Sequence, residues 1–104
     1  MIAIVATIKV HEDKVGDFER TALELEANVK AHEPGCLVYR MARCRADPLT
    51  YRSLEIFQDQ HALDSHVAAD YFVAAAQALR RCTAGDSIVE FADTLIQAQP
   101  GQIR

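Results

Sequence analysis

The chain has 104 residues, half of them apolar and a quarter charged, with a formal net charge of −4. This length allows one domain, 1–104, with a modest core and a poor ratio of volume to surface. The negative charge and the lack of a basic stripe argue against nucleic acid as a partner. No run approaches the roughly 20 apolar residues of a membrane span, and residues 1–10 lack the regions of a secretory signal.

The first half of the chain predicts a strand, a long helix and a second strand. Residues 2–10 are apolar on both alternating faces, so both sides of this strand can be covered. Asp13 is the expected N-cap of a helix over residues 13–32, which a Pro-Gly pair ends. Its apolar stripe consists of Val15, Phe18, Ala22, Leu25 and Val29. Residues 36–44 form the second strand.

The second half begins with a hairpin. A turn at residues 45–48 joins the second strand to a third over residues 51–57. Asp59 caps the next helix, which is interrupted near residues 69–70 and ends by Gly85. Leu63, His66 and Val67 share the inner face of its first part with Ala62, and the stripe of the second part contains Phe72, Ala75, Leu79 and Cys82.

A final strand over residues 87–97 completes the order β-α-β-β-α-β, and residues 98–104 are expected to be a loose tail. This order is typical of an α+β, ferredoxin-like fold with a four-stranded antiparallel sheet and both helical segments on one face. Leu54 and Ile56 then point to the other face. Because that face is apolar, we expect a homodimer that packs sheet to sheet, with the long final strand extending toward the partner.

The three cysteines are an odd number. Cys36 and Cys44 lie in one predicted strand at a separation of roughly 26 Å, which is too far for a disulfide. We therefore expect reduced thiols and a cytoplasmic protein.

Several catalytic motifs are incomplete. His11 and Glu12 open like a zinc-protease motif, but Val15 stands where its second histidine belongs. No cysteine pair has C-x-x-C spacing, and the scattered glycines make no phosphate-binding loop. The run 64–66 (Asp-Ser-His) cannot converge as a triad, because its residues are adjacent on a helix. We expect no metal, flavin or haem.

His66 and Glu55 are the candidate polar groups of a site. His66 lies on the apolar side of a helix, and Glu55 shares the helix-facing side of its strand with Phe57. One interpretation is structural, with a satisfied core histidine and an ion pair at the sheet edge or across the dimer. The other is a titratable pair in a cavity, in which Glu55 is partnered by His66 or Arg40. The sequence leaves both open.

The interrupted helix is a second pointer to a site. A break over a sheet leaves a gap in which a small ligand can fit. Tyr71 and Phe72 follow the break, and Phe72 suits the helix core as well as it suits a substrate contact.

These segments together resemble the antibiotic biosynthesis monooxygenase family of dimeric α+β barrel proteins, over about residues 2–97. The resemblance is carried by the opening I-A-I-V-A-T-I-K-V, E-P-G-C-L at 33–37 followed by Tyr39, L-E-I-F at 54–57, D-x-x-A-L-x-x-H at 59–66, and the aromatic Phe72. The family includes quinol and anthrone monooxygenases, haem-degrading enzymes and a proton-transfer isomerase.

The resemblance implies oxygenation without a cofactor. A phenol or hydroquinone is deprotonated in a dry pocket, its anion passes an electron to O₂, and a quinone results. His66 and Glu55 are the catalytic candidates. The candidate substrate-binding residues are Phe57, Phe72, Tyr51 and Arg40.

The chain also departs from the family pattern. Phe57 stands where the family often has Trp, and residues 69–71 replace the usual Ser-Pro-His. Ala76 aligns with the histidine of the haem-degrading branch, which argues against haem oxygenation. Two alternatives remain, namely a proton-transfer isomerase of a small hydroxyketone metabolite and a small-molecule-binding dimer without turnover.

Overall fold

The computed structural model describes residues 1–95 and confirms the predicted order of elements. The strands are β1 (Ile2–Lys9), β2 (Cys36–Arg43), β3 (Thr50–Phe57) and β4 (Ile88–Asp93). The helices are the 3₁₀ turn η1 (Glu12–Lys14), α1 (Val15–His32), α2 (Gln60–Ala68) and α3 (Asp70–Arg80). No described helix has the length and apolar character to cross a membrane.

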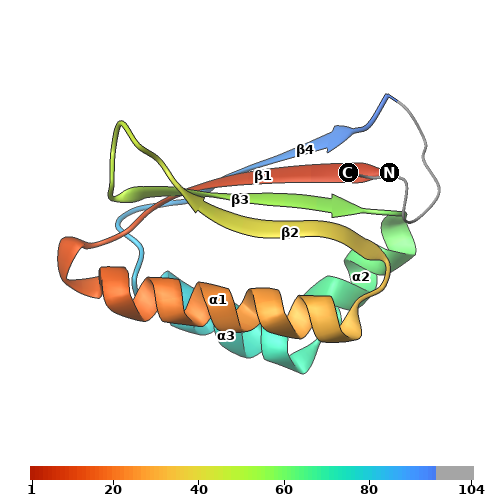
Figure 1. Cartoon of the computed structure of the whole chain (residues 1–104), viewed down its shortest axis with the longest axis horizontal. Coiled ribbons are helices and arrows are strands. Elements are labelled where there is room, and N and C mark those ends of the chain that lie inside the picture. The colour runs from red at the N-terminus through yellow and green to blue at the C-terminus, as the bar shows by residue number, and fades with distance from the viewer. Residues whose placement is uncertain (96–104) are drawn as a thin grey trace.

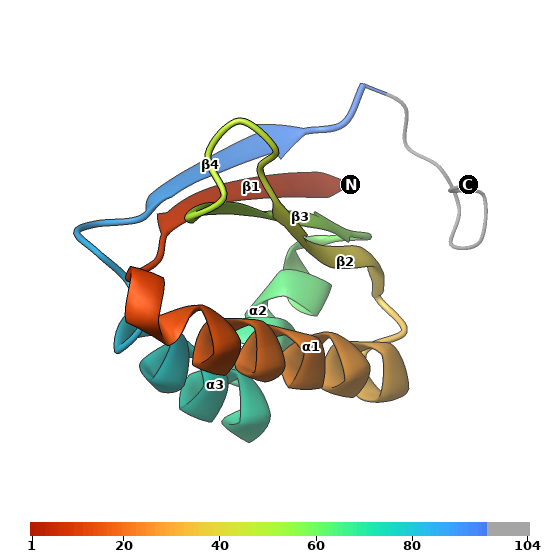
Figure 2. The same ribbon diagram turned by 60° about the vertical axis from the view of Figure 1, so that its left-hand side comes forward.

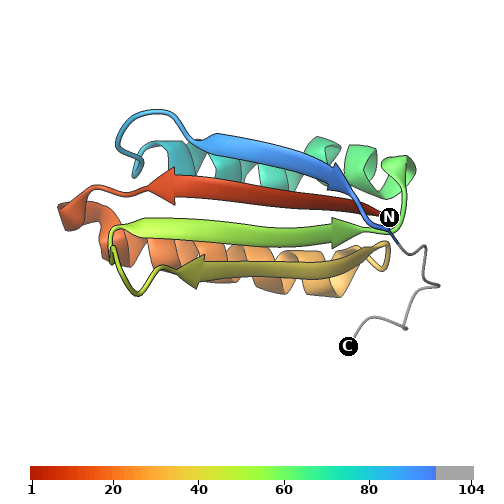
Figure 3. The same ribbon diagram turned by 90° about the horizontal axis from the view of Figure 1, so that it is seen from above.

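The four strands form one antiparallel sheet in the order β2-β3-β1-β4 (Figure 3). All three α-helices lie on the same side of this sheet (Figures 1 and 2). This is the ferredoxin-like α+β arrangement that the sequence predicts, with the core between the sheet and the helices.

Helix α1 covers β2 and the neighbouring part of the sheet with its predicted stripe. Phe18, Ala22, Leu25 and Val29 are all buried, as a spacing of three and four requires on one helix face. The predicted N-cap was wrong. Asp13 lies inside η1, and the chain enters α1 from a tight turn closed by the Lys14 N–H to the His11 carbonyl at 2.9 Å.

The second helical segment is interrupted where the sequence predicts. Asp59 caps α2, and its carboxylate accepts a hydrogen bond from the Ala62 N–H at 2.8 Å. Ala69 is extended (φ −66°, ψ 135°), which ends α2, and α3 begins at the next residue. The break gives α2 and α3 different directions beneath the sheet (Figure 2).

Strand β4 is shorter than predicted. It spans Ile88–Asp93 instead of residues 87–97, and Thr94 lies outside the strand, where its N–H bonds to the Met1 carbonyl. The last two residues of the predicted strand and the predicted tail, 98–104, lie outside the described residues.

The sheet face opposite the helices has apolar side chains together with charged ones, including Arg40, Arg52 and Glu90, and has no cover in the described part of the chain. Register places Val5 beside Leu54 and Ala3 beside Ile56 on this face. Leu54 is 41% exposed and Ile88 62% exposed. The outward orientation of Leu54 and Ile56 agrees with the sequence prediction.

Gly35 fixes the distance between the start of β2 and helix α2. A Cβ at this position would lie 2.7 Å from the Cβ of Ala62, and the Gly35 carbonyl accepts the Gln58 N–H at 2.9 Å.

We predict that Gly35→Ala lowers the free energy of unfolding by about 1–3 kcal/mol, because α2 must shift. Gly16→Ala, in open space on α1, should instead raise it by about 0.5–1 kcal/mol. Chemical denaturation measures both, and equal stability of the two variants would contradict the prediction.

Candidate active site

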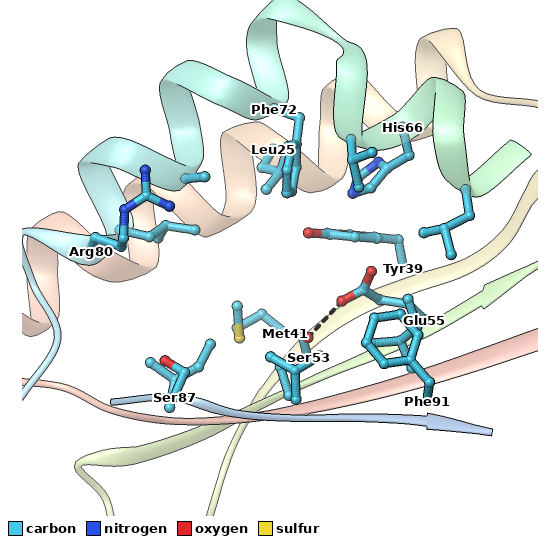
Figure 4. Close-up of a pocket in the computed structure, with 18 of the residues that line it drawn as sticks. Leu25, Tyr39, Met41, Ser53, Glu55, His66, Phe72, Arg80, Ser87 and Phe91 are labelled. Carbon is cyan, nitrogen blue, oxygen red and sulfur yellow. Dashed lines mark hydrogen bonds between the residues drawn. The ribbon is translucent and has the colours of Figure 1, made fainter. Parts of the chain in front are cut away.

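A cavity of about 430 Å³ lies between the inner face of the sheet and the broken helix (Figure 4). Its volume is in the range of small-molecule sites. Antiparallel register builds its floor from two rows of inward side chains. One row is Tyr39, Glu55, Ile4 and Phe91, and the next is Met41, Ser53, Ala6 and Val89. Leu63 and His66 of α2, and Phe72, Ala76 and Leu79 of α3, line the opposite wall.

His66 is the most deeply buried polar side chain of this cavity, at 2% exposure. Its ring lies between three aromatic rings, with centroid distances of 4.4 Å to Phe72, 5.1 Å to Phe57 and 5.3 Å to Tyr39. Nδ1 is 2.9 and 3.0 Å from the two carboxylate oxygens of Glu33. Nε2 has no hydrogen-bond partner among residues 1–95, and the ring extends toward the cavity (Figure 4).

Glu33 determines which nitrogen of His66 is available. It is the C-cap residue of α1, and its side chain also accepts a hydrogen bond from the hydroxyl of Tyr71 on α3. A carboxylate accepts hydrogen bonds, so Nδ1 carries a proton, and in the neutral ring Nε2 has the free lone pair. The sequence analysis missed Glu33, although an acidic residue at a helix C-terminus is electrostatically unfavourable and was a signal of another role.

Glu55 faces the cavity from β3, as predicted, but its predicted partners were wrong. Its carboxyl accepts a hydrogen bond from Ser53 Oγ at 2.7 Å, not from Arg40 or His66. Burial raises the pKa of Glu55 above its ordinary value, against smaller lowering effects of the Ser53 bond and of His66. Glu55 therefore keeps its proton to a higher pH than an exposed carboxyl does.

Tyr39 adds a hydroxyl that the sequence analysis did not assign to the site. It pairs with Glu55 across β2 and β3, and its hydroxyl points into the cavity (Figure 4). Burial, and then the charge of Glu55, raise its pKa, so the hydroxyl stays protonated. No hydrogen-bond partner of this hydroxyl is present in the described chain. Alternation along β2 from Met41 would have placed it on the inner face.

Only some of the predicted substrate-binding residues lie at the cavity. Phe72 lines the cavity, and Phe57 is fully buried behind the His66 ring. Tyr51 lies in a different part of the core, where its hydroxyl donates to a carboxylate of α1. Arg40 does not line the cavity. It follows the inward Tyr39 on β2, so it leaves the inner face, and its guanidinium lies 3.7 Å from a carboxylate oxygen of α1.

The surroundings of Cys36 and Ala76 bear on two other kinds of site, a thiol nucleophile and a haem ligand. Burial, and then the Glu33 carboxylate, raise the pKa of the Cys36 thiol to about 12, so it is a poor nucleophile at neutral pH. All three cysteines are unpaired, as predicted. Ala76 lines the cavity but has no ligand atom for a haem iron. In the part of the chain that the structure describes, no three His, Cys, Asp or Glu side chains are grouped to hold a metal ion.

The comparisons with known proteins agree with this architecture. The model of the family described as antibiotic biosynthesis monooxygenase matches residues 1–78. This chain belongs to that family. A crystal structure from Caulobacter crescentus, provisionally assigned as an antibiotic biosynthesis monooxygenase, is 41% identical, with a TM-score of 0.88 over 91% of this chain and 90% of that chain.

Two further solved structures are similar to this chain. A conserved protein from Methanosarcina mazei is 25% identical, with a TM-score of 0.83 over 88% of this chain and 89% of that one. The structure of an antibiotic biosynthesis monooxygenase is 23% identical, with a TM-score of 0.84 over 92% of this chain and 100% of that one, which is a likeness of fold. No curated protein sequence matches the chain.

The raised pKa of Glu55 predicts a pH-dependent stability. Above the ordinary Glu value of 4.5, the unfolded chain releases this proton while the folded chain retains it, so the free energy of unfolding falls as pH rises toward the folded pKa. Glu55→Gln removes this loss. We expect the variant to gain melting temperature over the parent from pH 4.5 into the neutral range, and no gain below it.

Exposed Glu24 on α1 offers the matched control, Glu24→Gln. Thermal scans at several pH values measure both variants. A Glu55→Gln difference that is independent of pH, or that favours the parent at neutral pH, would contradict the assignment.

Proposed function

We propose that this protein is a monooxygenase that oxidises a small phenolic or hydroquinone-type substrate with O₂, in the cavity between sheet and helices and without a cofactor. Membership of the antibiotic biosynthesis monooxygenase family supports the reaction class. The observation that carries the assignment of residues concerns His66. Its Nε2 is buried at the cavity wall with no hydrogen-bond partner among residues 1–95, while Glu33 holds Nδ1.

The first step is proton removal by His66. Nε2 accepts the phenolic proton, and the resulting phenolate passes one electron to O₂. Because the substrate anion supplies the electron, the step draws on no redox cofactor. The aromatic and apolar side chains around the ring keep water from the anion. The Tyr39 hydroxyl, which stays protonated, donates a hydrogen bond to the developing negative charge.

The later steps use Glu55 in both of its protonation states. Superoxide and the phenoxyl radical form a C–O bond at a ring carbon ortho or para to the hydroxyl, and Glu55 protonates the peroxide. The Glu55 carboxylate then removes the hydrogen of that carbon as a proton. The O–O bond breaks, and hydroxide leaves with the proton held by His66. The sum is phenol plus O₂ giving quinone plus water.

A substrate screen tests the reaction class. Hydroquinones, anthrones and small hydroxyketones are incubated with the purified protein after treatment with a chelator, and oxygen uptake and product mass are recorded. We expect oxygen uptake with a product that has gained one oxygen and lost two hydrogens. A product of unchanged mass would instead indicate the isomerase, and binding without conversion would indicate the non-catalytic dimer.

His66 and Glu33 are tested by substitution on any substrate that turns over. We predict that His66→Gln lowers kcat by roughly 10²- to 10⁴-fold, the usual size of general-base catalysis. His61→Gln, an exposed site on the same helix, should leave kcat unchanged. Glu33→Gln should lower kcat more than it raises KM, because the amide can donate to Nδ1 and select the wrong tautomer. Full activity of a folded His66→Gln protein would remove His66 from the mechanism.

We also propose that the protein is a homodimer joined through the outer sheet face. The apolar side chains of that face, including Leu54 at 41% exposure, suit a sheet-to-sheet interface. We expect sedimentation velocity at micromolar concentration to show a dimer. Leu54→Asp should give a monomer, because burying an unpaired carboxylate is costly. Leu23→Asp, on α1, should stay dimeric, and a parent protein that sediments as an 11.5 kDa species would contradict the proposal.

A further inference from the structure

Arg80 places a cation at the end of the cavity that is remote from His66. Phe72, Ala76 and Arg80 follow one another at intervals of four on α3, so they share the face of the helix that borders the cavity. Figure 4 shows the guanidinium at the opposite end of the cavity from His66 and Glu55. Periodicity therefore brings this arginine, which is the exposed last residue of α3, to the rim of the cavity.

The charge of Arg80 is not neutralised within residues 1–95. No carboxylate in that part of the chain lies within ion-pair distance of its guanidinium, whereas the guanidinium of Arg43 lies 3.5 Å from a carboxylate. Among the described residues that line the cavity, Arg80 is the only Lys or Arg. Neither of the two described cavity carboxyls forms an ion pair with Arg80. Glu55 accepts a hydrogen bond from Ser53 Oγ at 2.7 Å, and Asp64 accepts one from Gln60 at 2.8 Å.

The cavity has a hydroxyl group near Arg80, and apolar side chains separate Arg80 from His66. Ser87, just before β4, faces Arg80 across the cavity (Figure 4). Between this end and His66 the wall is apolar, with Ala76 and Leu79 from α3. The cavity thus has an acid-base end and a cationic end, joined by an apolar middle.

We propose that the substrate carries a carboxylate that Arg80 binds, on the side of the molecule opposite the hydroxylated ring. A guanidinium suits the planar carboxylate through paired hydrogen bonds, and its full charge exceeds the partial negative charge of the α3 C-terminus. A single cation favours a monoanion over a phosphate dianion. The inference rests on the proposed function in taking the cavity as the substrate site.

The spacing of the two ends limits the size of this substrate. Phe72, whose ring lies 4.4 Å from the His66 ring, and Arg80 are separated by eight residues of helix, or about 12 Å. A hydroxyl at His66 and a carboxylate at Arg80 are therefore joined by an extended frame. Two or three fused aromatic rings fit this length, and a single benzoic acid does not.

The test compares two probes of the same shape, 6-hydroxy-2-naphthoate and the uncharged 6-hydroxy-2-naphthamide. Dissociation constants are measured from naphthalene fluorescence, which the absence of Trp leaves undisturbed, in low salt and under nitrogen so that no oxidation occurs. We expect the parent protein to bind the carboxylate about tenfold more tightly than the amide. Arg80→Gln should reduce this preference to near unity, whereas Arg81→Gln, which does not line the cavity, should retain it.

An equal affinity for both probes in the parent, a preference that persists in Arg80→Gln, or failure of both probes to bind would overturn the proposal. The measurement needs no turnover. A carboxylate preference without oxygen uptake on any phenol would contradict the proposed oxidation and leave Arg80 as the anion-binding residue of the cavity. Oxygen uptake on a phenol, together with equal affinity of the parent protein for the carboxylate and amide probes, would support the proposed oxidation and overturn the role of Arg80.

Discussion

The hydrogen bond between Glu33 and His66 is the constraint on which the site depends. It joins the end of α1 to the inner face of α2, and the Tyr71 hydroxyl adds α3 to the same carboxylate. A carboxylate at a helix C-terminus and an imidazole among aromatic rings are both unfavourable alone. Each offsets the cost of burying the other, so the three helix ends meet at one point. The break at Ala69 is tolerated there because it lets His66 and Tyr71 approach Glu33 from successive helices.

This arrangement leaves the cavity with polar groups that a substrate can still engage. Nε2 of His66 has no hydrogen-bond partner in the described part of the chain, the Tyr39 hydroxyl retains its proton, and burial favours the protonated form of Glu55. In a cavity lined mainly by apolar side chains, a substrate that supplies a proton and then accepts hydrogen bonds completes all three groups. The chemistry we propose therefore follows from groups that the fold holds in place, and the specificity for an anion follows from Arg80 at the far end.

The order of elements, the broken helix and the inward faces of α1 and β3 could be predicted because each depends on local periodicity and on caps such as Asp59. The partner of His66 could not be predicted from the sequence, because Glu33 is 33 positions away and its proximity depends on how α1 and α2 pack. Arg40 was assigned to the site without applying the alternation that directs Tyr39 inward. The length of β4 was overestimated because its apolar residues continue beyond Asp93, where pairing with β1 ends.

The central claim is that Glu33 fixes the tautomer of His66 so that Nε2 faces the cavity as a proton acceptor. A long-range proton–nitrogen NMR correlation of the histidine side chains, recorded at a pH at which the ring is neutral, observes this directly. We predict that His66 carries its proton on Nδ1 with Nε2 unprotonated, and that Glu33→Gln disturbs this state. A proton on Nε2 with a bare Nδ1, or an even mixture of the two tautomers, would contradict it.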